Sequence, residues 1–179
     1  MTEVWIGLGS NIGEPEHALR QALERLDALP QTLLKKVSPF YRTAAWGETD
    51  QPDFLNAVAS LETALSPHDL LEALFDIETR LGRQRDGRRW GPRQLDLDLL
   101  VYGKQLIDEV DLKVPHPYLA QRAFVLVPLH DLAPQLEVPG MGRVDRLLAD
   151  LDEAERSGVR LDACQPELIE ATNTRRIAS

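Results

Sequence analysis

Two periodicities divide the chain into predicted strands and helices. Apolar residues that alternate with other residues are typical of half-buried strands, whereas apolar residues at every third or fourth position are typical of amphipathic helices. The alternating stretches predict strands at residues 4–8, 33–42, 54–63 and 95–102, with shorter strand-like pieces at 105–107 and 111–114. The helical spacing predicts helices at residues 15–29, 66–81 and 144–151, and a short helix within 118–133.

Local signals mark the ends of the first two helices. Pro15 suits a first helical position, and Pro30 cannot continue a helix. Ser66 followed by Asp69 is similar to a capping box, in which the two ends of the motif satisfy free backbone N–H groups. Gly82 is a common residue just after a helix and predicts the end of the second one.

The order of the predicted elements indicates the fold class. Strands and helices are interleaved, and several connections between strands are short enough to be hairpins. An α+β fold with an antiparallel or mixed sheet is therefore favoured over a doubly wound parallel sheet. The hydrophobic pattern fades after Asp152, so we predict one domain over residues 1–152 and a polar C-terminal extension over residues 153–179.

Composition narrows the classes of function. The chain has 179 residues with 29 acidic and 20 basic side chains, a net charge of −9, which disfavours general nucleic-acid binding. The longest purely apolar run, residues 123–129, is far shorter than the roughly 18 residues of a membrane span. A single cysteine excludes a disulfide framework or a cysteine-based metal cluster. With no secretory signal visible at the N-terminus, we expect a cytoplasmic protein without a membrane partner.

The first candidate for chemistry is a pair of carboxylates. In the predicted strand at 95–102, Asp96 and Asp98 share one face, and the leucines between and beside them share the other. Positions two apart on a strand are roughly 6.8 Å from each other. That spacing suits carboxylates that hold Mg²⁺ against a polyphosphate, because Mg²⁺ usually takes one or two carboxylates and completes its shell with phosphate oxygens and water. The alternative is a strand whose polar face simply meets water.

The second candidate is a segment rich in arginine and glycine just before these carboxylates. Residues 80–93 contain six arginines and one aspartate, a local charge of +5 in an acidic chain. Arginine fits phosphate through two parallel hydrogen bonds and stays charged. A solvated basic loop is the alternative for this segment alone. Together with the paired aspartates it favours a site for Mg²⁺ and a nucleotide, the combination that phosphoryl transfer uses.

Three weaker candidates lie elsewhere. Phe54 and Asn56 share one strand face and could hold a flat heterocycle by stacking and hydrogen bonding, although core packing is the commoner role of such a pair. His116, between two prolines, could donate to a phosphate or make a structural hydrogen bond. The glycines at residues 7–13 lack the spacing of a P-loop or a dinucleotide motif and are more typical of a tight turn or a close approach to a ligand.

Four segments, taken in order, carry a resemblance to a known family. They are residues 7–11, residues 40–56, the run Arg-Trp-Gly-Pro-Arg-Gln-Leu-Asp-Leu-Asp at 89–98, and Val-Pro-His-Pro at 114–117. Over about residues 3–150 the chain resembles 6-hydroxymethyl-7,8-dihydropterin pyrophosphokinase, and the run at 89–98 is the specific part. The resemblance implies transfer of the β,γ-diphosphate of ATP to the pterin hydroxymethyl group with release of AMP, in folate biosynthesis. It also implies a monomer, and an antiparallel sheet with a ferredoxin-like core and helices on both faces.

The same resemblance implies roles for individual residues, matched position by position. Asp96 and Asp98 would bind two Mg²⁺ ions, and Arg83 and Arg93 would stabilise the transferring group. The implied ATP-binding residues are Glu78, Arg85, Arg89, Trp90, Arg93, Leu99, His116 and Arg122. The implied pterin-binding residues are Gly9, Thr43, Ala44, Ala45, Trp46, Phe54, Asn56, Trp90, Asp96 and Phe124. The chain departs from the family pattern at Ala44-Ala45, where many relatives have proline, and at Phe75, where some have a polar residue.

Two other functions are open from the sequence. A non-catalytic module could bind nucleotide or RNA through the arginine segment, but the chain lacks the aromatic-rich strand motif of RNA-recognition domains. A kinase could instead transfer only the γ-phosphate of ATP. The nucleotide product separates the two enzymatic alternatives, because diphosphate transfer releases AMP and phosphate transfer releases ADP.

Overall fold

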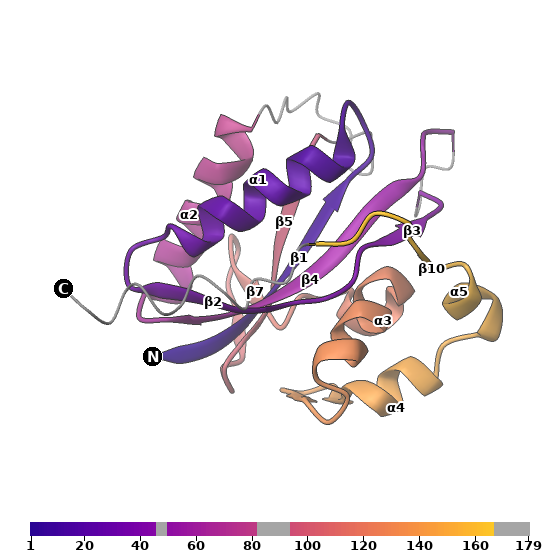
Figure 1. Ribbon diagram of the computed structural model, residues 1–179. Helices are drawn as coiled ribbons and strands as arrows, with labels where there is room; N and C mark the ends of the chain where they lie inside the picture. The colour runs from indigo at the N-terminus through magenta and orange to yellow at the C-terminus, as the bar shows by residue number, and fades with distance from the viewer. Residues whose placement is uncertain (46–49, 82–93, 167–179) are drawn as a thin grey trace.

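The computed structural model describes residues 1–45, 50–81 and 94–166 (Figure 1). The main sheet consists of β1 (Thr2–Ser10), β2 (Thr32–Val37), β3 (Tyr41–Thr43), β4 (Phe54–Thr63), β5 (Asp96–Tyr102) and β10 (Arg160–Leu161). Its helices are α1 (Pro15–Asp27), α2 (Pro67–Arg80), α3 (Ala123–Leu132), α4 (Val144–Ala149) and α5 (Glu153–Ser157), with a 3-10 turn, η1, at Leu119–Gln121. Two small hairpins pair β6 (Ile107–Asp108) with β7 (Lys113–Val114) and β8 (Glu137–Val138) with β9 (Gly142–Arg143).

The sheet is antiparallel at every pairing among the described residues. Its order is β10-β3-β4-β1-β5, and β2 pairs with the far end of β4. The chain runs β1-α1-β2-β4-α2-β5, and these strands lie in the spatial order β2-β4-β1-β5, which is the ferredoxin-like arrangement. Figure 1 shows α1 and α2 on one side of the sheet and α3 and α4 on the other. The predicted α+β class and antiparallel sheet are confirmed.

Alternation along the strands explains why helices cover both faces. In β4, the odd-numbered residues from Leu55 to Leu61 pack into the core under α1 and α2. Val58 points the other way and packs with Trp5 in a second core under α3 and α4. Because both faces of the central strands are apolar, neither could be left to water without losing roughly 25 cal/mol per Å² of apolar surface.

Most predicted elements lie where the sequence indicated, and one is divided. The strand predicted at 54–63 is β4, and the helix opened by Ser66 is α2, whose Asp69 N–H donates to the Ser66 hydroxyl. The single strand predicted at 33–42 is wrong, because it separates into β2 and β3 around Pro39. At the break, the hydroxyl of Ser38 accepts from the N–H of Val58 at 2.9 Å, and the Ser38 N–H donates to the carbonyl of Val58 at 2.8 Å.

The C-terminal extension contributes to the same sheet as far as it is described. After α5, the two residues of β10 pair with β3 at the edge of the sheet. This strand was not predicted, and the predicted domain boundary at residue 152 stays a prediction. Among the helices within the described ranges, none combines the length and the apolar character that a membrane crossing requires.

Candidate active site

The paired carboxylates lie on the edge strand β5, on the face that carries α3. The register of β1 and β5 sets Asp96 opposite Gly9 and Asp98 opposite Gly7. These glycines have no side chains, so β1 presents bare backbone between the two carboxylates and Asn56, which is the partner of Gly9 on β4. The alternation predicted from the sequence therefore brings Asp96 and Asp98 to one face, beside a strip of main chain that carries no side chains.

A cavity of about 300 Å³ lies along the outer edge of β5. It combines acidic, apolar and imidazole side chains from three parts of the fold. Its lining includes Leu71, Phe75 and Glu78 from α2, Asp96, Asp98 and Leu99 from β5, Leu112, and His116. Glu78, Leu99 and His116, which were predicted to bind ATP, thus share one cavity with the predicted metal ligands.

Glu78 also anchors the edge of the sheet. Its side chain is almost fully buried, and its Oε1 accepts the backbone N–H of Leu97 at 2.7 Å. β5 lies at the edge of the sheet and has β1 as its only strand partner among the described residues. The carboxylate therefore satisfies a donor that no further strand would take, and it holds the strand that carries both aspartates.

Arg122 is a buried cation in contact with one of the two carboxylates. Its guanidinium donates from Nη1 to Oδ2 of Asp98 at 3.2 Å, and it is only 6% exposed. The same guanidinium lies over the rings of Tyr118 and Phe124, with Cζ 5.4 and 5.6 Å from the ring centroids. Aromatic faces on this group fix its plane and direct its donors towards Asp98.

His116 is neutral at physiological pH in this environment. Burial, and next the charge of Arg122, lower the pKa of His116 to about 4, although Asp96 acts in the opposite direction. Its Nδ1 accepts the backbone N–H of Tyr118 at 3.2 Å, which assigns the single proton to Nε2. Nε2 lies 3.8 Å from Oδ2 of Asp98, so the ring presents an N–H donor at the carboxylate side of the cavity rather than a second positive charge.

The residues predicted to bind the pterin gather on the α3 face around Asn56. Both Thr43 and Asn56 are buried, and Nδ2 of Asn56 donates to Oγ1 of Thr43 at 2.8 Å. A methyl group added at Gly9 would lie 3.2 Å from Oδ1 of Asn56 and 3.7 Å from the ring of Phe54. Gly9 is therefore the residue that lets β1 approach this pair closely. Phe124 enters the same face from the first turn of α3.

Several residues around this cluster were not predicted. Asn11 is buried, and its Nδ2 donates to Oε1 of Gln51 at 2.9 Å and to the carbonyl of Pro52 at 3.0 Å, which ties the end of β1 to the approach to β4. The hydroxyl of Tyr41 donates to Asp131 on α3 at 2.5 Å. Burial, followed by this hydrogen bond, raises the pKa of Tyr41 to about 12. The Gly-Ser-Asn sequence at 9–11 was a signal for the first contact, whereas nothing local links Tyr41 to a residue 90 positions away.

Some predicted residues are not brought into the cluster. Ala45 is buried at the end of β3, while Ala44 is exposed beside it. The candidates Trp46, Arg83, Arg85, Arg89, Trp90 and Arg93 lie outside the described residues.

The donor set of Asp96 and Asp98 fits magnesium. Both carboxylates are partly exposed, on one strand face, and both line the cavity. Mg²⁺ is usually held by one or two carboxylates with its remaining positions taken by water and phosphate oxygens, which a cavity open to solvent can admit. Softer ligands are not needed for such a site, and the single cysteine, Cys164, lies on the other face of the sheet near α1.

Comparison with known proteins identifies relatives over most of the chain. A family model described as 7,8-dihydro-6-hydroxymethylpterin-pyrophosphokinase (HPPK) matches residues 5–134. The 2-amino-4-hydroxy-6-hydroxymethyldihydropteridine pyrophosphokinase of Pseudomonas aeruginosa is 51% identical over 146 residues, which are 82% of this chain and 90% of that protein. The protein of the same name from Haemophilus influenzae is 43% identical and covers 83% of this chain and 92% of its own length.

Solved structures of HPPK-DHPS chains share the fold. A crystal structure of HPPK-DHPS in complex with substrates has a TM-score of 0.64 at 11% sequence identity. Plasmodium falciparum HPPK-DHPS, wild type with STZ-DHP, has a TM-score of 0.66 at 12% identity. Each comparison covers 83% of this chain, and this chain spans 43% of the length of either HPPK-DHPS chain. At these identities the likeness concerns the fold alone.

Proposed function

The chain belongs to the 7,8-dihydro-6-hydroxymethylpterin-pyrophosphokinase family, an ATP-dependent diphosphotransferase family of folate biosynthesis, and from this we propose how its residues perform the reaction. The reaction moves the β,γ-diphosphate of ATP to the hydroxymethyl group of 6-hydroxymethyl-7,8-dihydropterin and releases AMP. One observation carries the assignment of the site. The carboxylates of Asp96 and Asp98 separate the cavity along β5 from the buried Asn56 cluster, so one side suits a nucleotide and the other a flat heterocycle.

We assign the cavity to ATP. Glu78, Leu99 and His116 line it, and Arg122 adjoins it through Asp98. The neutral His116 can donate from Nε2 to a phosphate oxygen without the energy needed to protonate a buried ring. Arg85, Arg89, Trp90 and Arg93, which lie outside the described residues, complete the ATP-binding set in this proposal.

Two Mg²⁺ ions are proposed to bind at Asp96 and Asp98, between the protein and the phosphates. When bound, they would supply positive charge at the phosphate oxygens and fix the orientation of the diphosphate. The protein's part is to hold both carboxylates in place: Glu78 fixes the backbone of β5 beside Asp96, and Arg122 orients the side chain of Asp98. Arg83 and Arg93 would stabilise the charge that develops on the transferring group.

The pterin is assigned to the α3 face beside Asn56. The amide of Asn56 and the hydroxyl of Thr43 offer neighbouring polar groups to the ring edge, and they are held together by their own hydrogen bond. Phe54 and Phe124 provide the aromatic surfaces that would stack on the ring. Gly9, the main chain of Ala44, Ala45 and Trp46, and the side chains of Trp90 and Asp96 complete the proposed set.

The setting of the enzyme follows from its substrates and composition. We expect a cytoplasmic monomer whose partners are ATP and the pterin, with neither nucleic acid nor a membrane as a partner. The net charge of −9 supports the absence of nucleic acid binding, and a single cysteine suits a reducing compartment.

The test of the function is the identity of the nucleotide product. Purified protein is mixed with ATP, Mg²⁺ and reduced 6-hydroxymethylpterin, and the nucleotides are separated by chromatography. AMP that forms only when pterin and metal are both present is the expected result. ADP would contradict diphosphate transfer, and AMP formed without Mg²⁺ in a chelating buffer would contradict the metal assignment. The control omits the pterin, so that hydrolysis of ATP is measured separately.

A further inference from the structure

Residues 160–165, here called the strap, form a second neighbour for the short strand β3. The register pairs Leu161 with Tyr41 and Arg160 with Arg42, and the Asp162 N–H donates to the carbonyl of Phe40 at 2.9 Å. β3 has three residues and pairs with β4 on its other side. The strap therefore turns a short edge strand into an internal one, and its backbone hydrogen bonds fix the position of that strand in the sheet.

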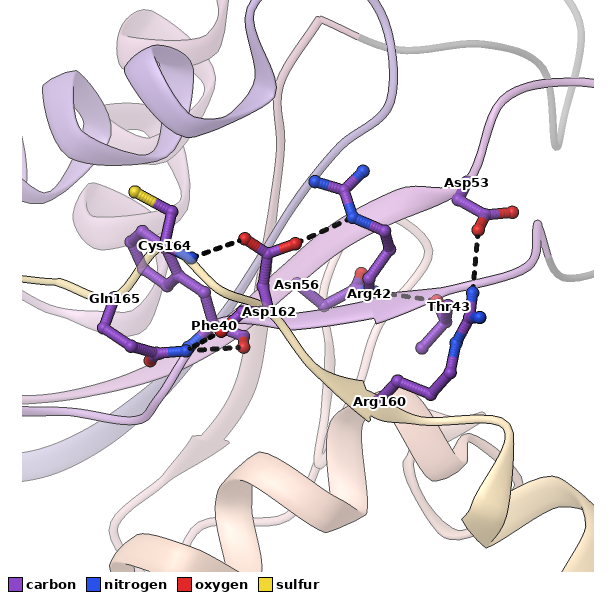
Figure 2. Close-up of polar contacts among 9 residues, drawn as sticks. All are labelled: Phe40, Arg42, Thr43, Asp53, Asn56, Arg160, Asp162, Cys164 and Gln165. Carbon is purple, nitrogen blue, oxygen red and sulfur yellow. Dashed lines mark hydrogen bonds and ion pairs between the residues drawn. The ribbon is translucent and has the colours of Figure 1, made fainter.

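Side chains close the strap over β3 (Figure 2). Arg42 Nε donates to Oδ2 of Asp162 at 2.7 Å, and the side chain of Asp162 is only 11% exposed. The Phe40 N–H donates to Oε1 of Gln165 at 2.9 Å, and Nε2 of the same amide reaches the Phe40 carbonyl at 3.4 Å. A charge-assisted bond of this length at a largely buried carboxylate is stronger than an exposed ion pair.

The strap also contacts two elements beyond β3. Arg20 on α1 donates from Nη2 to the carbonyl of Gln165 at 2.7 Å. At the other end, Arg160 Nη2 lies 3.1 Å from Oδ2 of Asp53, the residue directly before β4 (Figure 2). The strap thus ties α1, β3 and the start of β4 into one unit.

Both tied strands carry residues of the proposed pterin site. Thr43 lies one position after Arg42, and Phe54 lies one position after Asp53. Asn56, two positions further on β4, donates to Thr43, so the spacing of β3 and β4 determines the geometry of this pair. The strap lies outside the region that the family model matches, because that match ends at residue 134.

We propose that the strap positions the pterin-binding side of the site, with Asp162, Arg42 and Arg160 as positioning residues that do not touch the substrate. The inference rests on the proposed assignment of the pterin to Asn56 and Thr43. In this arrangement Asp162 acts through Arg42 on Thr43, and Arg160 acts through Asp53 on Phe54. The proposed ATP cavity lies along β5, which β4 and β1 separate from β3, and it shares none of these contacts.

The test measures KM for each substrate in full-length variants. Asp162→Ala removes the partner of Arg42, and we expect KM for the pterin to rise about five- to tenfold, within the range for loss of one ordinary hydrogen bond, because the effect reaches the substrate indirectly. The expected KM for ATP and kcat stay within about twofold of wild type. Asp162→Asn keeps an oxygen acceptor for Arg42 and is expected to restore most of the pterin KM. Asp145→Ala, which breaks the Arg143–Asp145 pair far from β3, is the matched control and should leave both KM values unchanged.

A second variant keeps the test decisive if Asp162→Ala folds poorly. Arg160 is 65% exposed, so Arg160→Ala should fold normally and raise the pterin KM by about two- to fourfold. The strap proposal is overturned if Asp162→Ala and Arg160→Ala match the Asp145→Ala control, or if they raise both KM values equally with a lower melting temperature. Asn56→Ala separates the two proposals. An unchanged pterin KM in that variant overturns the assignment of the pterin to Asn56. A raised pterin KM supports that assignment, and the strap variants then test the strap alone.

Discussion

Asp96 and Asp98 are two residues apart in sequence but have different surroundings. Oδ2 of Asp98 accepts from the buried guanidinium of Arg122, and the N–H of His116 lies on the same side. Asp96 is opposite Gly9 and thus adjacent to the Asn56 cluster. The two carboxylates therefore have unequal surroundings: Asp98 is oriented from the side of the proposed ATP cavity, and Asp96 lies where the two substrates would meet.

Replacing either carboxylate tests the metal assignment. We expect Asp96→Ala and Asp98→Ala each to lower the rate of AMP release by at least about 10²-fold, because each removes a ligand of the proposed Mg²⁺ ions. The rate is measured over a range of Mg²⁺ concentrations. Asp150→Ala, at an exposed position after α4, serves as the control. Normal turnover in either site variant would show that the pair is only the polar face of a strand.

The glycines of β1 allow a matched comparison within one strand. A methyl group at Gly9 would lie 3.2 Å from Oδ1 of Asn56, which is tighter than most such contacts, whereas at Gly7 it would lie 3.4 Å from the side chain of Leu100. We expect Gly9→Ala to displace Asn56 and raise the pterin KM about tenfold, since one lost polar interaction is worth about 1–2 kcal/mol. Gly7→Ala, on the same face, should change it far less. Equal effects of the two substitutions would exclude crowding of Asn56 as the cause.

At the scale of elements, α2 supports the edge strand β5 through one buried carboxylate. Glu78 accepts the Leu97 N–H at 2.7 Å, and the peptide it holds lies between Asp96 and Asp98, the two proposed metal ligands. An edge strand without this acceptor would leave a buried donor unsatisfied, which costs about 1–3 kcal/mol. The helix therefore contributes both to the stability of the strand and to the spacing of Asp96 and Asp98.

Variants of Glu78 separate these contributions. We expect Glu78→Ala to lower the free energy of unfolding by about 2 kcal/mol, measured by urea denaturation, and to lower the melting temperature by roughly 4–8 °C. Glu78→Gln retains an oxygen that can accept from Leu97, so its loss should be below about 1 kcal/mol. If the two variants are equally destabilised, the charge of Glu78 rather than its hydrogen bond to Leu97 stabilises the strand.

For the molecule as a whole, local patterns predicted most helices and strands. The features that they did not predict depend on pairing between distant segments. The alternation at 54–63 gave the correct bounds of β4, although both faces of that strand are buried rather than one. The break at Ser38 was missed, since the hydrogen bonds that bridge it go to Val58, twenty residues away. β10 was missed for the same reason: two residues have no periodicity, and they pair with Tyr41 and Arg42.

The candidate site shows the same division. The acidic pair and Glu78, Leu99 and His116 could be predicted, because their motif is continuous or their family positions match, and they line one cavity. The hydrogen bonds of Asn11 to Gln51 and of Arg42 to Asp162 could not be predicted, since they join segments 40 and 120 positions apart that only the fold brings together. The residues proposed to contact substrate carry a sequence signature, whereas the residues that position them are distributed through the chain.

His116 makes the stability of the whole molecule depend on pH in a defined direction. Its folded pKa of about 4 lies below the ordinary value of 6.5, so between these values the unfolded chain binds a proton that the folded protein does not. Stability contributed by the neutral ring is fully present above pH 6.5 and is lost as the pH falls towards 4. A shift of this size corresponds to about 3 kcal/mol.

The prediction is tested by urea denaturation at pH 4.5 and 7.5 in buffer with a metal chelator. We expect the free energy of unfolding of wild type to fall more between these values than that of His116→Gln, by about 2–3 kcal/mol, because glutamine does not titrate. Glutamine can still accept the Tyr118 N–H and donate towards Asp98. The two proteins therefore keep the same local contacts and differ only in whether the side chain titrates. Parallel pH dependence in the two proteins would mean that the pKa of folded His116 stays near its ordinary value, which would contradict the assignment of a ring kept neutral by burial.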